Sequence, residues 1–111
     1  MLTVADIDFY KEIRSSNLEL DGDPAAAPLH DNDFQNLPHT VAITAECDPL
    51  SHDGKDYCEA IVNSGGKAIW IEEEGLVHGY LRARTTVSRA EASFKRMIKA
   101  LNMLADRRWD Y

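Results

Sequence analysis

A chain of 111 residues has room for one modest hydrophobic core. Its 44% hydrophobic and 28% charged residues are typical of a globular protein, and its net charge of −7 argues against nucleic acid as a partner, because phosphate binding depends on Lys and Arg. No apolar run approaches the roughly 20 residues of a membrane span. Acidic residues stand where a signal peptide would be basic, so we expect a cytoplasmic protein without a membrane span.

The charge is unevenly distributed along the chain. Most acidic side chains precede residue 81, and most basic ones follow it. This pattern favours a solvated basic helix face that complements an acidic body over a site for an anionic partner. Two cysteines, Cys47 and Cys58, are too few for a disulfide framework, and neither lies in a zinc-binding spacing. We expect two reduced thiols, and the sequence indicates no metal and no cofactor.

The first predicted element is a helix from Thr3 to about Ser15. The Thr3 hydroxyl can cap this helix, and Asp6 lies near its positive end. The apolar residues predict that it buries one stripe, made of Val4, Ile7, Tyr10 and Ile13. Residues 16–38 hold three of the four prolines and many Asp and Asn residues, which predicts a long irregular connection.

Two short apolar runs, Val41–Ala45 and Ala68–Ile71, predict strands, with His39 and Thr40 opening the first. A helix is predicted between them, from about Asp53 to Ser64, and a glycine pair ends it. The residues expected to face the sheet are Tyr57, Ala60, Ile61 and Ser64. A crossover of this length is what two parallel strands require. The fold class is therefore α/β: a parallel β-α-β unit between an N-terminal and a C-terminal helix.

The last helix carries the clearest helical pattern. Ser88 with Glu91 predicts a capping box. An apolar stripe follows and predicts packing behind the sheet; its members are Phe94, Met97, Ile98, Leu101 and Leu104. Between the second strand and this helix, Glu72, Glu73 and Glu74 are expected to form a solvated loop edge.

Residues able to do chemistry follow both predicted strands. Asp48 comes just after the first strand, and His78 lies beyond the second. Because parallel strands end at the same edge of a sheet, where open α/β sheets bind their ligands, we expect these two side chains to meet. We expect a carboxylate oxygen within hydrogen-bond reach of Nδ1. A carboxylate beside an imidazole is the orienting half of a Ser-His-Asp triad.

These residues carry a family resemblance. The motifs are Thr44-Ala45-Glu46-Cys47-Asp48-Pro49-Leu50, Asp53-Gly54, Tyr57, Gly65 and His78-Gly79-Tyr80. Together they resemble the C-terminal part of the hormone-sensitive-lipase-like esterases of the α/β-hydrolase fold. The resemblance implies that Asp48 is the triad acid and His78 the triad base. Tyr80 replaces the family's usual Phe, and His52 stands where the family often has Asp.

The nucleophile of that family is not recognisable in this chain. Its serine lies in Gly-x-Ser-x-Gly, and its oxyanion donors come from a His-Gly-Gly motif further upstream. Neither motif occurs here. In this fold the serine precedes the acid and the histidine in chain order. Residues 1–111 are therefore expected to be the C-terminal portion of a single α/β-hydrolase domain, without its nucleophile-bearing part.

Two classes of function follow from this reading. In the first, the chain is part of a serine esterase or lipase-like enzyme that acts on acyl esters, and it is inactive alone. In the second, it is an inactive relic that binds or oligomerises, through self-association or with the missing N-terminal portion.

Two local alternatives are weaker. Zinc usually needs three protein ligands in a defined geometry, which disfavours a metal site made of Asp48, His52 and His78. A second possibility is that Glu73 or Glu74 tunes His78.

Overall fold

A computed structural model describes residues 1–15 and 22–111 of the chain. Residues 16–21, the first part of the predicted connection, lie outside the described residues. In chain order the elements are helix α1 (Val4–Ser15), 3₁₀ helix η1 (Pro28–His30), strand β1 (Thr40–Cys47), helix α2 (Ser51–Asn63), strand β2 (Ala68–Val77), 3₁₀ helix η2 (Tyr80–Ala83) and helix α3 (Ser88–Ala105).

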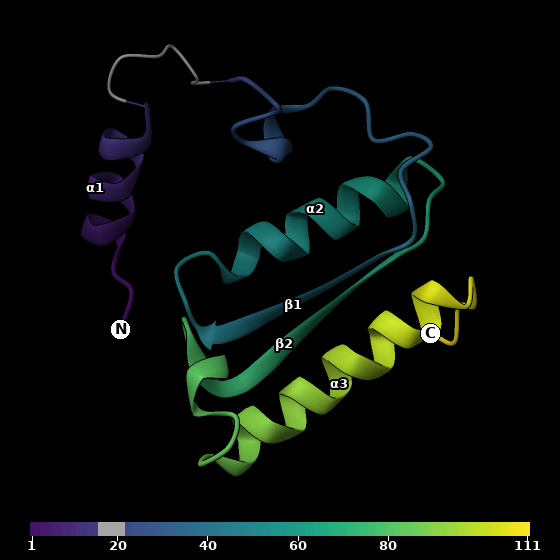
Figure 1. Cartoon of the computed structure of the whole chain (residues 1–111). Helices are drawn as coiled ribbons and strands as arrows, with labels where there is room; N and C mark the ends of the chain where they lie inside the picture. Colours follow the sequence, from purple (N-terminus) through teal and green to yellow (C-terminus); the bar gives the residue numbers. More distant parts are fainter. Residues whose placement is uncertain (16–21) are drawn as a thin grey trace.

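The centre of the fold is a two-stranded parallel sheet. β1 pairs with β2 from Thr40↔Ala68 onward, and α2 makes the crossover between them. Figure 1 shows α2 over one face of the sheet and α3 over the other. The predicted β-α-β unit is confirmed. Both strands are longer than predicted, and β2 extends six residues past Ile71, so the three glutamates belong to the strand and the expected loop edge is wrong.

Helix α2 lies close to the sheet because Gly54 has no side chain. A Cβ at this position would lie 2.7 Å from Thr44 Cγ2 and 3.4 Å from Trp70 Cδ1. Further along the same helix, Cys58 and Ile61 are buried. The helix ends as predicted at its glycines, in a Schellman turn in which Gly65 N–H donates to Val62 O and Gly66 N–H to Ile61 O. With φ +88°, Gly65 occupies the left-handed region that this turn requires.

Helix α3 packs behind the sheet as predicted, but through a different face. The buried positions are small or flexible ones, namely Ala90, Ser93, Ala100 and Met103. Ala90 packs with Ala45 and Leu76 in a buried cluster. Of the predicted stripe, Met97 and Leu104 are half-buried, whereas Phe94, Ile98 and Leu101 are exposed. The prediction of the stripe is therefore wrong for three of its five residues, because small residues let the helix approach the strands and the larger side chains face outward.

Helix α1 does not bury its predicted stripe. Figure 1 shows it away from the sheet and its two covering helices. Of the four stripe residues only Ile7 is half-buried, whereas Val4, Tyr10 and Ile13 are exposed. The amphipathic pattern indicated a face suited to burial, and no described element covers that face.

In the connection that follows α1, the part from residue 22 to β1 holds no helix or strand besides η1, so an irregular connection is confirmed there.

The two predicted helix caps have opposite outcomes. At α1, the Asp6 carboxylate accepts hydrogen bonds from Thr3 N–H and Oγ1, and Asp6 N–H donates to Thr3 Oγ1, which confirms the cap. At α3, Ser88 is the first helical residue, and no side chain caps the helix. Glu91 instead binds Lys95 one turn later, at 2.7 Å, so the capping box is wrong.

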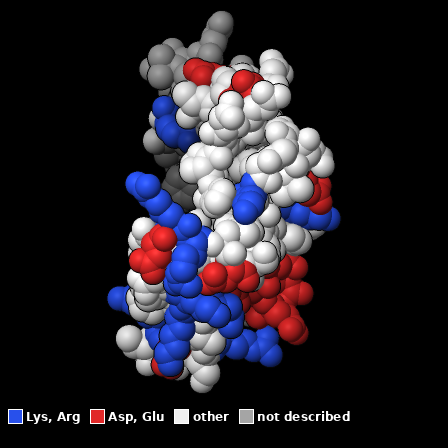
Figure 2. Space-filling view, turned by 90° about the vertical axis from the view of Figure 1, so that its right-hand side faces the viewer, with Lys and Arg blue, Asp and Glu red and all other residues white. Residues whose placement is uncertain are grey.

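The basic C-terminal part lies against the acidic strand β2. Figure 2 shows Lys and Arg gathered on the lower half of one face, next to a group of acidic side chains. Two arginines of α3 reach β2: Arg96 pairs with the Glu73 carboxylate, and Arg89 Nη1 donates to the Glu74 carbonyl at 3.2 Å. The basic helix therefore complements the acidic body of the chain, in the way the charge pattern favoured.

The close approach at Gly54 yields a stability prediction. Replacing a helical glycine by alanine normally stabilises by up to about 1 kcal/mol. Here Gly54→Ala should destabilise by about 1–2 kcal/mol, because its Cβ meets the stiff Thr44 side chain. Thr44→Ser removes that methyl group and keeps the hydroxyl, so Gly54→Ala should be neutral or stabilising in the Thr44→Ser background. Urea unfolding of the four proteins measures both effects, and an equal loss in both backgrounds would contradict this packing account.

Candidate active site

Asp48 and His78 meet at the carboxyl ends of the two strands. Asp48 directly follows β1, and His78 directly follows β2. Since the last residues of the two strands, Cys47 and Val77, pair with each other, Asp48 and His78 leave the sheet side by side. Asp48 Oδ2 lies 2.8 Å from His78 Nδ1, which is the geometry expected from the sequence. The Asp48 side chain is 11% exposed, whereas that of His78 is 50% exposed. The Asp48 carboxylate is therefore largely shielded from solvent, whereas half of the His78 side chain is accessible.

The local chain fixes the Asp48 carboxylate in two directions. Its Oδ1 accepts a hydrogen bond from Leu50 N–H at 2.9 Å, while Oδ2 faces the imidazole. The Asp48 carbonyl accepts from Ser51 N–H at 3.0 Å, which starts α2. Pro49 fits the second position of this turn, because its ring fixes φ near the value that a β-turn requires there. The turn orients one carboxylate oxygen towards the histidine and leaves the other bound to the backbone.

The chain matches a known family. A family model described as alpha/beta hydrolase fold matches residues 1–82. The chain belongs to this α/β-hydrolase family. A curated relative is similar over a shorter range: an arylesterase of Saccharolobus solfataricus is 35% identical over 63 residues, which are 57% of this chain and 21% of the arylesterase.

Solved structures support the same hydrolase fold. An esterase of Pyrobaculum calidifontis superposes with a TM-score of 0.86 and 24% identity, over 95% of this chain and 34% of the esterase. Its monoclinic crystal form gives a TM-score of 0.83. An α/β-hydrolase enzyme from the metagenome of Lake Arreo, Spain, is 28% identical with a TM-score of 0.61, over 65% of this chain and 23% of the enzyme. The predicted fold, part of an α/β-hydrolase of the hormone-sensitive-lipase-like family, is confirmed, and the chain spans about a third or less of these relatives.

Glu73 has a partner other than His78. Its carboxylate is buried and binds the guanidinium of Arg96, with Arg96 Nε donating to Oε1 at 2.8 Å. The hydrogen bond from Arg96 lowers the pKa of Glu73, and a bond from Ser93 adds to this effect, while burial opposes it. Among the described residues, the side chain of His78 contacts Asp48 and neither Glu73 nor Glu74, so the structure gives no support to the alternative that Glu73 or Glu74 tunes His78. Glu73 joins β2 to α3.

A polar network that the sequence did not indicate lies between α2 and the sheet. The buried Ser51 hydroxyl donates to Glu72 Oε2 at 2.8 Å and lies 3.0 Å from Thr44 Oγ1, which in turn accepts from Trp70 Nε1 at 2.8 Å. The network fixes the first residue of α2 to both strands. It therefore also supports the turn that carries Asp48. Of these four residues, only Thr44 lies in one of the motifs that resemble the hormone-sensitive-lipase-like esterases.

The other candidate ligands and nucleophiles lie elsewhere. His52 faces Trp70, with ring centroids 6.2 Å apart, and no group of three His, Cys, Asp or Glu suited to a metal is found in the described ranges. The Ser93 hydroxyl contacts Tyr80 at 2.7 Å. Both cysteines are free thiols, Cys47 exposed and Cys58 buried. Burial raises the pKa of the Cys58 thiol.

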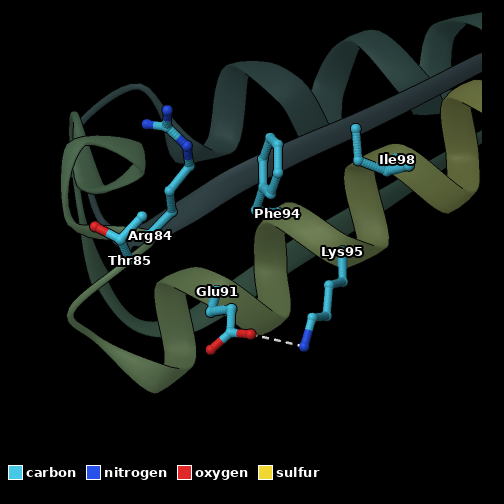
Figure 3. Close-up of a pocket in the computed structure, with 6 residues that line it drawn as sticks. All are labelled: Arg84, Thr85, Glu91, Phe94, Lys95 and Ile98. Carbon is cyan, nitrogen blue, oxygen red and sulfur yellow. Dashed lines mark ion pairs between the residues drawn. The ribbon is translucent and has the colours of Figure 1, made fainter.

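A surface hollow lies beside α3 and does not include Asp48 or His78. Figure 3 shows it between the segment after η2 and the outer face of α3; its lining residues are Arg84, Thr85, Glu91, Phe94, Lys95 and Ile98. Arg84 lies over the Phe94 ring at 5.6 Å.

Among the helices in the described part of the chain, none is long and apolar enough to cross a membrane.

The Glu73–Arg96 pair predicts a pH-dependent stability. Arg96→Met should leave a buried carboxylate without its partner, at a cost of about 1–3 kcal/mol at pH 7. This is less than the roughly 3–5 kcal/mol of a fully buried pair, because the Arg96 side chain is 47% exposed. The pKa of Glu73 is lowered in the folded state, so its contribution is present above the unfolded pKa and is lost as the pH falls through the folded value.

Urea unfolding at pH 7 and at about pH 3 measures this difference. The control is Lys95→Met, which breaks an exposed pair with Glu91 on the same helix and should change stability by less than about 0.5 kcal/mol. A cost for Arg96→Met that stays constant down to the lower pH would contradict the ionic origin.

Proposed function

We propose that this chain supplies the acid and the base of a serine carboxylic-ester hydrolase. The observation that carries the proposal is the 2.8 Å contact between Asp48 Oδ2 and His78 Nδ1 at the carboxyl ends of two parallel strands. This edge is where open α/β sheets place their ligand site. Family membership and the arylesterase and esterase relatives support ester hydrolysis as the reaction.

The geometry supports a distinct role for each residue. Asp48, with one oxygen bound to the Leu50 N–H, keeps the His78 proton on Nδ1, and it stabilises the imidazolium formed during the reaction. Nε2 is then the basic atom. It removes the proton of a serine hydroxyl as that oxygen attacks the ester carbonyl, and it returns the proton to the leaving alcohol. Water then enters by the same route and releases the acid from the acyl-enzyme.

In this proposal the serine and the oxyanion donors come from outside the chain. The sequence has no Gly-x-Ser-x-Gly, and the chain spans 21% of the arylesterase and 34% of the Pyrobaculum calidifontis esterase. We infer that the chain corresponds to the C-terminal portion of such an enzyme and works with a nucleophile-bearing portion. The exposed apolar side chains on α1 and α3 favour association with such a portion.

A second candidate function is a binding or oligomerising module without catalysis. The same exposed apolar side chains favour it, as does a sheet of only two strands. Light scattering of the purified chain gives its mass in solution, and an ester assay gives its turnover. A stable assembly of this chain that remains inactive with any nucleophile-bearing partner would support the module over the enzyme part.

The isolated chain should show no triad esterase activity. Acyl transfer needs a nucleophile and oxyanion donors, and His78 alone has no serine proton to remove. A nitrophenyl ester assay at several chain concentrations measures this. Saturable hydrolysis that His78→Ala abolishes would show that the chain contains its own nucleophile and would contradict the proposed division of labour.

Turnover should depend on both residues once the chain is completed. The completing part is the region of the Pyrobaculum calidifontis esterase that this chain does not match, fused in one polypeptide or added as a second chain. His78→Ala should remove most of the turnover. Asp48→Asn should lower kcat by about 10⁴-fold, as expected when the imidazole adopts the wrong tautomer.

The matched control is Cys47→Ala, an exposed side chain next to Asp48, which should change the rate little. A completed enzyme that keeps near-normal kcat with His78→Ala would show that these residues are not the acid and the base.

A further inference from the structure

The two strands change register just before the Asp48–His78 pair. Ala45 pairs with Glu73, and Cys47 pairs with Val77. Between these pairs β1 supplies Glu46 alone, while β2 supplies three residues, so β2 carries a bulge. In the register that holds from Thr40↔Ala68 to Ala45↔Glu73, Leu76 rather than His78 would lie opposite Asp48. At about 3.3 Å per residue, that register would move His78 roughly 6–7 Å along the strand, beyond hydrogen-bond reach.

Gly75 gives the bulge its shape. Its φ is +71°, in the left-handed region that residues other than glycine rarely adopt. A Cβ on Gly75 would also meet Arg89 Nη1, but this atom is the end of a flexible side chain and can move away. A glycine at this position is therefore required by the backbone conformation.

Glu46 holds the bulge from the opposite strand. Its Oε2 accepts a hydrogen bond from Gly75 N–H at 2.7 Å. Gly75 lies in the unpaired part of β2, so this carboxylate satisfies a backbone donor that the normal ladder leaves without a partner. A bond between a backbone N–H and a carboxylate is charge-assisted and stronger than one between neutral groups.

Helix α3 supports the bulge from behind. Arg89 Nη1 donates to the Glu74 carbonyl at 3.2 Å. Leu76 is buried against Ala45 and Ala90. The bulge is thus fixed by one hydrogen bond from β1, one from α3 and one buried side chain.

From these contacts we propose that Glu46 and Gly75 are positioning residues that set the strand register at which His78 meets Asp48. They act through the backbone of β2. The inference rests on the proposed function in taking His78 as the base, but the alignment of His78 with Asp48 can be tested without any catalysis.

The test measures the imidazole of His78 by NMR in the 111-residue chain labelled with ¹⁵N. At alkaline pH, ring nitrogen shifts give the ratio of the Nδ1–H to the Nε2–H tautomer, and the hydrogen-bonded Nδ1–H proton gives a downfield resonance. The original chain should show the Nδ1–H tautomer. Glu46→Ala should lower this ratio by about 10-fold or more, the factor expected for losing a hydrogen bond to a charged group, and should remove the downfield resonance.

Three variants separate positioning from charge and from folding. Glu46→Gln keeps an acceptor for Gly75 N–H and should retain the Nδ1–H tautomer. Gly75→Ala should behave like Glu46→Ala. Glu74→Ala removes an equal charge close by, leaves the backbone carbonyl that binds Arg89 in place, and should have no effect.

Each unfavourable result overturns the proposal. An unchanged tautomer ratio in Glu46→Ala would show that the register does not depend on this carboxylate. A lowered ratio of the Nδ1–H to the Nε2–H tautomer in Glu46→Gln would show that the charge of Glu46, rather than its hydrogen bond to Gly75, sets the tautomer. Collapse of the whole folded amide spectrum in Glu46→Ala would show a global structural role. None of these outcomes depends on ester hydrolysis, so the positioning role and the proposed function can fail separately.

Discussion

The parallel pairing of β1 with β2 is the constraint on which the rest of this structure depends. It brings residues 30 apart in sequence, Asp48 and His78, to one edge of the sheet. It also demands a crossover helix, which α2 supplies, and it leaves both faces of the sheet to be covered. The site is thus a consequence of strand direction, and the helices are what make that direction possible.

Small residues decide how closely the helices cover the sheet. Gly54 lets α2 approach Thr44 and Trp70, and Ala90 lets α3 approach Ala45 and Leu76. Close approach in turn makes the polar contacts possible, because short side chains such as Ser51 and Ser93 can reach partners on the strands and on the turn that follows β2. Packing and hydrogen bonding are therefore coupled here, and both converge on the segment that carries Asp48.

The sequence predicted what depends on strand direction and missed what depends on side-chain size and local backbone conformation. Asp48 and His78 could be paired because two apolar runs flank a helix of crossover length. The bulge could not be foreseen, because a glutamate run followed by Gly75 resembles a loop. The buried face of α3 was missed because hydrophobic periodicity gives weight to Phe94 and Ile98, whereas Ala90 and Ser93 fit the space against the sheet.

The contacts that orient Asp48 and His78 all lie close to the two strand ends. Leu50 N–H and the start of α2 orient Asp48, and Glu46 and Gly75 belong to the same two strand ends. Such contacts involve the two strands, the crossover helix α2 and the helix α3 behind the sheet. The proposed chemistry is different, because the outer side of the half-exposed imidazole must meet a hydroxyl from elsewhere. In the proposed function, this small unit therefore orients the acid and the base, while the reaction itself depends on the surface that His78 faces.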